Sequence, residues 1–283
     1  MARIGLVCDS TCDLGPEWLA SHDVTMVPLK VTFGEATYLD WVELMPERFY
    51  ELLAAAPELP KTSQPSPADF AAVYRDLHAA GCDGIVSIHL SAAISGTIES
   101  AMMACAMVDV PVRVIDTLSV NLGEGLPLMA ALAARDAGGD LDTVEGAARA
   151  IVGKQRILFA LDSLEYLVKG GRAGRAQGLA ASLLNIKPVL SFAEDGVIAP
   201  YKKVKGIKRA VQEIATAVKE AGDGGIVRVG LLHSQAPDLV DELAAAIDAT
   251  GVSWEHVQTC AVGAVIGTYA GPRAIGAAFY PVA

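Results

Sequence analysis

The chain has 283 residues, of which 52% are apolar and 19% charged, and its formal net charge is −11. This acidic balance argues against nucleic acid as the main partner, because nucleic-acid-binding surfaces are basic. No apolar run reaches the roughly 18 residues of a membrane span, and the first residues lack the pattern of a secretory signal. We therefore expect a cytoplasmic protein without stable membrane insertion.

The five cysteines are an odd number for a disulfide framework, and most lie in apolar surroundings. They indicate buried, reduced thiols. Cys8 and Cys12 form a pair, but neither a second cysteine pair nor a histidine pair at helical spacing completes a zinc site. We expect no metal and no cofactor.

The first half of the chain repeats one order of elements: an apolar run, a polar loop and a helical pattern. Apolar runs predict buried strands at 4–8, 85–88 and 112–115. Helical spacing is found at 46–53, 67–77 and 129–137. This order is typical of a parallel α/β sheet, which binds ligands at the carboxyl ends of its strands. Thr11, Ser95 and Thr117 are expected at those ends.

A loop of small and hydroxyl residues at 91–97 leads into one of these helices. The apolar face of that helix is expected at Ile98, Ala101, Met102 and Cys105. The first N–H groups of a helix have no intrahelical partner and attract anions. Ser95 and Gly96 therefore suit an oxyanion or carboxylate, and a simple helix cap by Ser95 is the equal alternative.

A second pair of hydroxyls occurs at Thr62 and Ser63, in an extended segment that Pro65 stiffens. Ser66 and Pro67 supply the start of the next helix, as its N-cap and first residue. Thr62 and Ser63 have no such structural role, so they are candidates for a fixed polar contact. A solvated proline-rich loop is the alternative.

The second half of the chain has a different pattern. Helices are expected at 164–168, 207–221 and 237–249, with a small-residue helix that ends at Leu184. Strands are expected at 157–161, 187–192, 197–204, 227–232, 257–265 and 277–282. An Asp-Gly turn joins two of these strands as a hairpin. We expect a Rossmann-like parallel α/β domain at 1–155 and an α+β domain with antiparallel pairing at 156–283.

Seven short motifs follow one another along nearly the whole chain. They are Cys8-Asp9-Ser10-Thr11, Thr62-Ser63-Gln64-Pro65-Ser66-Pro67, Ile94-Ser95-Gly96-Thr97, Asp116-Thr117, Leu164 to Arg172, Leu184 to Leu190 and Ile266-Gly267-Thr268. In this order they resemble the DegV family, the fatty-acid-binding subunits of bacterial fatty acid kinase. The resemblance implies a fatty-acid tunnel between and within two domains.

The resemblance also implies how a long-chain fatty acid is bound. Its carboxyl group would be held by Thr62 and Ser95, with Ser63 and the Gly96 N–H assisting. A separate ATP-dependent kinase subunit would phosphorylate this carboxylate, and the acyl phosphate would feed phospholipid synthesis. The chain itself would not be an enzyme, and its sequence contains no Gly-x-x-x-x-Gly-Lys-Ser/Thr loop for ATP.

The charge of the chain is uneven. Between residues 169 and 209 there are nine Lys or Arg and only two acidic residues. The resemblance implies that Lys169 and Arg172, at the start of this region, dock the kinase subunit.

One position departs from the family pattern near the C-terminus, where Tyr269 stands in place of a frequent histidine. Tyrosine donates a hydrogen bond but carries no positive charge near neutral pH. Thr268 and Arg273 are further head-group candidates, and Arg273 is expected to supply the missing charge.

Two other functions remain open. A serine hydrolase would use Ser95 as its nucleophile, but the sequence has no Gly-x-Ser-x-Gly elbow, and its five histidines show no recognisable relation to Ser95. A carrier of another apolar carboxylic acid, such as a retinoid or sterol acid, fits the same residues.

Overall fold

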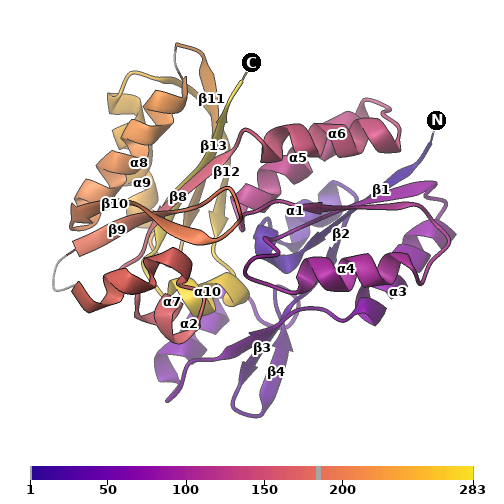
Figure 1. Ribbon diagram of the computed structural model, residues 1–283, viewed down its shortest axis with the longest axis horizontal. Coiled ribbons are helices and arrows are strands. Elements are labelled where there is room, and N and C mark those ends of the chain that lie inside the picture. Colours follow the sequence, from indigo (N-terminus) through magenta and orange to yellow (C-terminus); the bar gives the residue numbers. More distant parts are fainter. Residues whose placement is uncertain (1, 183–185, 223, 283) are drawn as a thin grey trace.

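The computed structural model describes residues 2–182, 186–222 and 224–282. In these ranges the strands form one parallel sheet, one mostly antiparallel sheet and one small antiparallel sheet. Figure 1 shows the parallel sheet with its helices on the right and the second large sheet on the left. This arrangement confirms the expected α/β class. No helix in the described ranges is long and apolar enough to cross a membrane.

The parallel sheet has the strand order β2-β1-β6-β7. Its strands are β1 (Ile4–Asp9), β2 (Val24–Val27), β6 (Gly84–His89) and β7 (Val112–Asp116). Every residue of β1 and β6 is buried, which explains their continuous apolar runs. Leu6 packs in one cluster with helices α5 (Leu122–Asp136) and α6 (Leu141–Val152), and Val7 packs in another with α3 (Pro67–Ala79) and α4 (Thr97–Cys105). The two faces are therefore covered by different helix pairs.

The second large sheet has the order β10-β9-β8-β13-β11-β12. Its strands are β8 (Arg156–Ala160), β9 (Ile186–Phe192), β10 (Ile198–Lys205), β11 (Ile226–His233), β12 (Ser253–Ala261) and β13 (Ile275–Pro281). Pairing is antiparallel as expected, except that β11 and β12 run parallel. The sheet contacts α8 (Ile207–Gly222) and α9 (Pro237–Ala249), while α5 contacts strands of both large sheets.

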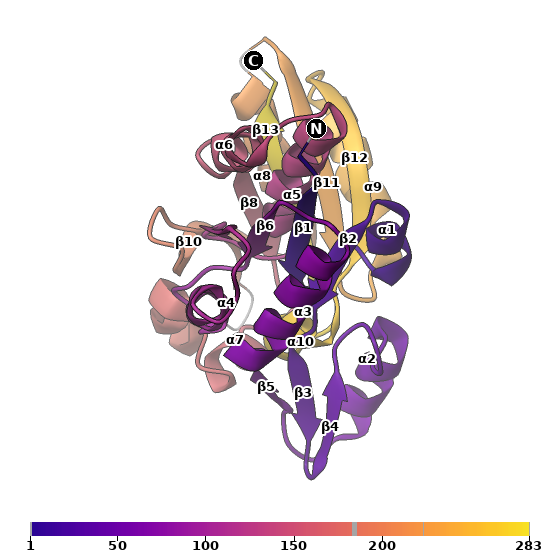
Figure 2. The same cartoon turned by 90° about the vertical axis from the view of Figure 1, so that its right-hand side faces the viewer.

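A small antiparallel sheet extends below the other two (Figure 2). It consists of β3 (Lys30–Phe33), β4 (Ala36–Leu39) and β5 (Lys61–Ser63), in the order β4-β3-β5. The sequence analysis did not predict this sheet: residues 24–31 form one mostly apolar stretch, but β2 ends at Val27 and β3 begins at Lys30. Helix α10 (Ala264–Ala270), near the end of the chain, contacts β3, β5 and α2 (Pro46–Ala55).

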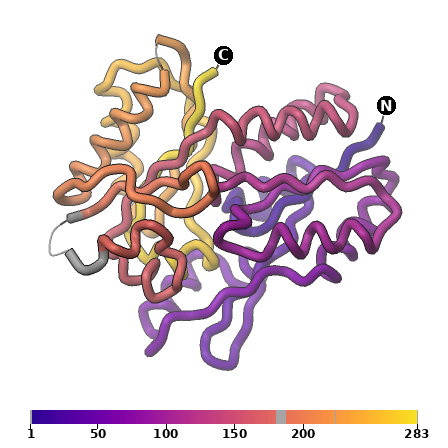
Figure 3. Tube along the Cα trace, in the orientation of Figure 1, coloured from indigo at the N-terminus to yellow at the C-terminus, as the bar shows by residue number. Residues whose placement is uncertain are grey.

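The remaining elements are short. They are η1 (Ser10–Cys12), α1 (Pro16–Ser21), α7 (Glu165–Lys169) and η2 (Gly174–Ser182). Figure 3 follows the path of the chain from the N-terminal half through α5 and α6 into the second large sheet. The division into domains at residue 155 stays a prediction.

Helix α5 begins at Leu122, seven residues before the expected start at Met129. Glycine and proline disfavour helix interiors, and the segment contains Gly123, Gly125 and Pro127. Proline has no N–H to give to the Gly123 carbonyl four residues back, and Gln155 Nε2 donates to that carbonyl at 2.5 Å instead. A tertiary hydrogen bond thus offsets the local preference.

Three further expectations are corrected. Met102 is 61% exposed, because α4 buries Ile98, Ala101 and Ala104. The strand expected at 257–265 ends at Ala261, and α10 begins at Ala264. The small-residue helix is the 3-10 helix η2, and its expected end at Leu184 lies outside the described residues.

Candidate functional site

A cavity with about 870 Å³ of empty space, including space open to solvent, lies where the three sheets meet. Fifteen of the 22 lining residues are apolar. Both halves of the chain contribute to this apolar wall, for example Leu90 and Ile94 before α4 and Phe159 and Phe192 in the second sheet. The cavity therefore suits a long apolar molecule.

Polar side chains gather on one part of the wall. Thr62 on β5 and Tyr269 on α10 both line the cavity, and their hydroxyls form a short hydrogen bond across 207 positions of sequence. The guanidinium of Arg172 lies over the Tyr269 ring, with its carbon 5.1 Å from the ring centroid. These three side chains are partly buried, so they are shielded from most of the solvent but can still be reached from the protein surface.

Arg172 brings a positive charge to this part of the wall. Its Nη1 donates to the Gly170 carbonyl at 3.0 Å and its Nε to the Ile94 carbonyl at 3.4 Å. Among the described residues no carboxylate pairs with it at 4.0 Å or less. A guanidinium with free donor capacity beside two hydroxyls favours a carboxylate or phosphate group.

Ser95 lies on the opposite loop, next to the carbonyl that Arg172 contacts. Its Oγ is 2.9 Å from Thr97 Oγ1 and accepts a hydrogen bond from the Thr97 N–H at 3.3 Å. Ser95 still lines the cavity, so capping and ligand contact are compatible. Gly96 is the N-cap of α4, and a Cβ there would lie 2.7 Å from Gln64 Nε2. This close approach brings the α4 loop against the segment after β5.

The structure brings some predicted residues together and leaves others apart. Thr62, Ser63, Ser95, Tyr269 and Arg172 line one cavity. Gly96 lines an outer groove that shares Ser95 with it.

Three predicted residues lie elsewhere. Thr268 is buried and donates its hydroxyl to the Ala264 carbonyl at 2.9 Å. Arg273 is exposed and pairs with Asp238 at 2.8 Å, so it does not supply the expected charge at the cavity. Exposed Lys169 pairs with Glu165 at 2.5 Å.

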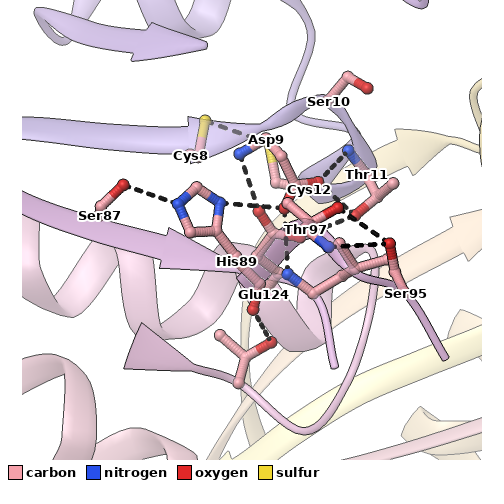
Figure 4. A network of polar contacts seen from close by, with 12 residues as sticks. Cys8, Asp9, Ser10, Thr11, Cys12, Ser87, His89, Ser95, Thr97 and Glu124 are labelled. Atoms are coloured by element: carbon pink, nitrogen blue, oxygen red, sulfur yellow. Dashed lines mark hydrogen bonds and ion pairs between the residues drawn. The ribbon is translucent and has the colours of Figure 1, made fainter. Parts of the chain in front are cut away.

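A buried polar network lies beside this site, at the carboxyl ends of β1 and β6 (Figure 4). Thr11 Oγ1 is 2.6 Å from Asp9 Oδ1 and 2.9 Å from Glu124 Oε2. A hydroxyl has one proton, so one of these carboxyl groups must be the donor in the second bond. Burial and the nearby Asp9 raise the pKa of Glu124 well above its ordinary value. Thr11 is thus a structural residue.

Asp9, His89 and Glu124 lie within 4.8 Å of one another, the spacing of metal ligands. Their hydrogen bonds already account for these atoms. Asp9 accepts from the Thr11 and Leu90 N–H groups, and His89 contacts Asp9 at 3.1 Å. We therefore interpret the cluster as a hydrogen-bond network that ties β1 to β6 and α5.

The same network contains a serine, a histidine and an aspartate in series. Ser87 Oγ is 2.6 Å from His89 Nε2, and His89 Nδ1 is 3.1 Å from Asp9 Oδ2. All three are fully buried and line none of the cavities described, and Tyr74 contacts Ser87 at 2.8 Å. This geometry gives no access to an ester. Ser95, the nucleophile of the hydrolase hypothesis, hydrogen-bonds with Thr97 and with no histidine in the described part of the chain.

Comparison with known proteins decides the family. A family model described as "Uncharacterised protein, DegV family" matches residues 3–282. The chain belongs to the DegV family. Protein DegV of Bacillus subtilis is 34% identical to it over 279 residues, which cover 97% of this chain and 98% of the relative.

Solved structures of DegV proteins share the whole fold. A fatty-acid-binding DegV family protein from Thermus thermophilus matches with a TM-score of 0.93 and 34% identity, over 99% of this chain and 100% of that one. A stearic-acid-binding protein from Eubacterium ventriosum matches with a TM-score of 0.86 and 29% identity, over 99% and 98%. The proteins that this DegV chain resembles are therefore fatty-acid-binding proteins.

Two polar residues of the wall were not predicted as site residues. Gln64 lies in the motif at 62–67 on which the family resemblance rests, so the neighbouring candidates Thr62 and Ser63 could have indicated it. Asn121 lines the cavity at the start of α5, where no sequence pattern marks it.

Proposed function

We propose that this chain binds a long-chain fatty acid in the cavity, with the carboxylate at Thr62, Ser95, Tyr269 and Arg172. The observation that supports this most strongly is the composition of the wall. On one side the apolar cavity meets two hydroxyls and a guanidinium that no described carboxylate neutralises, as a fatty acid requires. Ser63 and the Gly96 N–H are further candidates for the head group.

The energetics assign different tasks to the two ends of the ligand. Burying about 15 methylene and methyl groups of a sixteen-carbon chain contributes on the order of 12 kcal/mol. Each hydrogen bond to the carboxylate contributes roughly 1.5–3 kcal/mol. The acyl chain of the ligand therefore contributes most of the affinity. The polar residues determine which end of the ligand faces the opening of the cavity.

The second part of the proposal is a partner. A separate kinase subunit brings ATP and phosphorylates the presented carboxylate to an acyl phosphate for phospholipid synthesis. The groove outside Ser95 offers a contact surface for it, since Met102 and Met103 line the groove and are 61% and 56% exposed. Methionine adapts to varied apolar surfaces.

Lipid extraction from the purified protein, followed by mass spectrometry, tests the binding proposal. A long-chain fatty acid is the expected result, and a retinoid or sterol acid would point to another carrier function. Titration with palmitate and with hexadecanol then tests the head group. Thr62→Val removes a hydroxyl but keeps a β-branched side chain. It should lower the affinity for palmitate about tenfold and change the affinity for hexadecanol little. Thr37→Val, an exposed change in the same small sheet, is the control.

A reconstituted reaction with ATP and a fatty acid kinase subunit tests the partner. Met102→Glu with Met103→Glu should lower acyl-phosphate formation and leave palmitate binding unchanged. Met107→Glu is the matched control, because Met107 is 45% exposed and does not line the groove. Equal rates for all variants would exclude this groove as the docking surface.

A further inference from the structure

Asp13 connects three distant parts of the chain through one buried carboxylate. Oδ1 accepts hydrogen bonds from Trp41 Nε1 at 2.8 Å and from the Gly263 N–H at 3.1 Å. Oδ2 accepts from Asn121 Nδ2 at 2.5 Å. The side chain of Asp13 is only 2% exposed, so water does not replace these partners. We call these four residues the Asp13 clamp.

The backbone of the clamp adopts conformations that non-glycine residues avoid. Asp13, Trp41 and Asn121 have φ angles of 54°, 60° and 54°. Asp13, with ψ 22°, lies in the left-handed helical region that Asp tolerates, whereas Asn121, with ψ −134°, lies outside it. Tryptophan rarely adopts a positive φ. Gly263 has no room for a Cβ, which would lie 2.5 Å from Asp13 Oδ1 and closer still to the Trp41 indole. Strained conformations of this kind persist where the surrounding structure fixes them, and they concentrate at functional sites.

Two partners in the clamp lead directly to the cavity. Gly263 is the N-cap of α10, whose residues Val265 and Tyr269 line the wall. Asn121 lines the wall itself, and its Oδ1 accepts from the Leu122 N–H to cap α5. A shift of the clamp therefore moves both the Asn121 wall and the helix that carries the Tyr269 hydroxyl.

Helix α10 transmits such a shift because it is short and tightly packed. Asp40 Oδ1 accepts from the Ala264 N–H at 3.0 Å. At Gly267 the helix lies so close to Tyr50 Oη that a Cβ would be only 2.9 Å away. After the helix, Gly271 leaves no room for a Cβ beside the Tyr166 ring. The helix is therefore held by close contacts along its length, and a change at its N-cap is expected to displace it as a unit.

The clamp requires an acceptor at position 13. All three partners direct N–H groups at Asp13, so none of these bonds can be reversed by a proton on Asp13 unless the Asn121 amide turns away from the Leu122 N–H that its Oδ1 accepts. Burial and the nearby Asp40 raise the pKa of Asp13 well above its ordinary value, and the hydrogen bonds from Trp41, Asn121 and Gly263 act in the opposite direction. The hydrogen-bond pattern is complete only with a carboxylate at this position.

We propose that Asp13 is a positioning residue for the head-group site, which sets Asn121 and α10 so that the Tyr269 hydroxyl meets Thr62. The inference rests on the proposed function, because the head-group site is defined by the fatty-acid carboxylate. It adds a residue that touches no ligand but determines how well the site discriminates a carboxylate from other head groups.

An exchange of the two side chains tests this. In Asp13→Asn, the new amide N–H groups face those of Asn121, and one bond of the clamp is lost. In Asn121→Asp, two carboxyl groups face each other at the same short distance. In the double variant Asp13→Asn/Asn121→Asp, the amide at position 13 donates to the carboxylate at position 121, so the hydrogen bond between these two residues forms again with donor and acceptor exchanged. The double variant keeps the other bonds of the clamp, since the amide oxygen at position 13 still accepts from Trp41 and Gly263.

The readout is the ratio of palmitate affinity to hexadecanol affinity, because a general loss of stability weakens both ligands alike. Asp13→Asn should reduce this ratio about tenfold, the effect of one charge-assisted hydrogen bond. The double variant should restore it to within about threefold of the wild type. Asp76→Asn, an exposed change on α3, should have no effect.

Several outcomes overturn the inference. An unchanged ratio in folded Asp13→Asn, or an equal loss for both ligands, reduces Asp13 to a structural residue. If Asp13→Asn does not fold, the double variant is the test. A folded double variant whose ratio of palmitate to hexadecanol affinity stays well below that of the wild type contradicts the positioning role. Failure of the wild-type chain to bind palmitate would remove the proposed function and this inference together, whereas normal palmitate binding with an unchanged ratio removes only the inference.

Discussion

Arg172 gives the sharpest test of the head-group site, because the structure assigns it a place that the sequence did not. The resemblance implied that Arg172 docks the kinase subunit. In the structure its guanidinium lies over the Tyr269 ring and lines the cavity. The variant Arg172→Met removes the charge but keeps a long apolar stem that still covers part of the ring.

The expected magnitude follows from the contacts. A hydrogen bond to a charged group contributes about 1.5–3 kcal/mol, and a cation over an aromatic ring about 0.5–1 kcal/mol at a solvent-accessible site. Partial exposure of Arg172 favours the lower end. A loss of about 1.5 kcal/mol lowers the affinity for palmitate roughly tenfold. Hexadecanol has no carboxylate, so its affinity should change little.

Isothermal titration of Arg172→Met and Lys169→Met with both ligands measures this. Lys169 is exposed and paired with Glu165, so its replacement is a matched control on the neighbouring turn. Unchanged palmitate affinity in Arg172→Met, combined with slower phosphorylation, would refute the head-group role and support docking alone. Equal losses for palmitate and hexadecanol would show a packing role instead.

Three further predictions concern other residues near the site. Burial raises the pKa of Asp40 to about 7, against about 3.9 when unfolded, so the unfolded chain ionises first and stability should fall from about pH 4 to pH 7. This loss of stability should be on the order of a few kcal/mol. Asp40→Asn keeps the hydrogen bond from Ala264 and should reduce the loss, as measured by urea denaturation at pH 5 and pH 8. Gly170→Ala places a methyl group against the Tyr269 ring. It should lower the free energy of unfolding by about 1–3 kcal/mol in urea denaturation and lower the affinity for palmitate. An unchanged unfolding free energy and an unchanged affinity would contradict this packing. Tyr269→His should raise the affinity for palmitate as pH falls through about 6.5, because a protonated imidazole brings a positive charge to the carboxylate; isothermal titration at several pH values measures this.

The fold could be predicted where local chemistry and burial agree. The runs at 4–8 and 85–88 are apolar because β1 and β6 are buried on both faces. Ser66 and Asp69 form a complete capping box, with Asp69 Oδ2 accepting from the Ser66 N–H at 2.8 Å. In these cases a few neighbouring residues contain the whole signal.

Prediction failed where a distant residue reverses a local preference. Gln155 satisfies the carbonyl that Pro127 leaves free, and this contact spans 32 positions of sequence to Gly123. On α4, the spacing placed Met102 on the apolar face, but the helix packs against α3, β6 and β7 with Ala101 and Ala104 buried and Met102 exposed. Neither fact is present in a window of sequence.

The candidate site shows the same limit at the position where the family resemblance led us to expect a histidine and the chain has Tyr269. Arg273 follows Tyr269 closely in sequence, which made it the natural replacement charge, but Asp238 holds it at 2.8 Å. Arg172 is 97 positions from Tyr269 and still reaches its ring, because Gly170 allows α7 and α10 to approach closely. Arginine stays protonated at all physiological pH values, unlike histidine. If the proposed head-group site is correct, Tyr269 and Arg172 together offer a carboxylate a hydrogen bond and a positive charge.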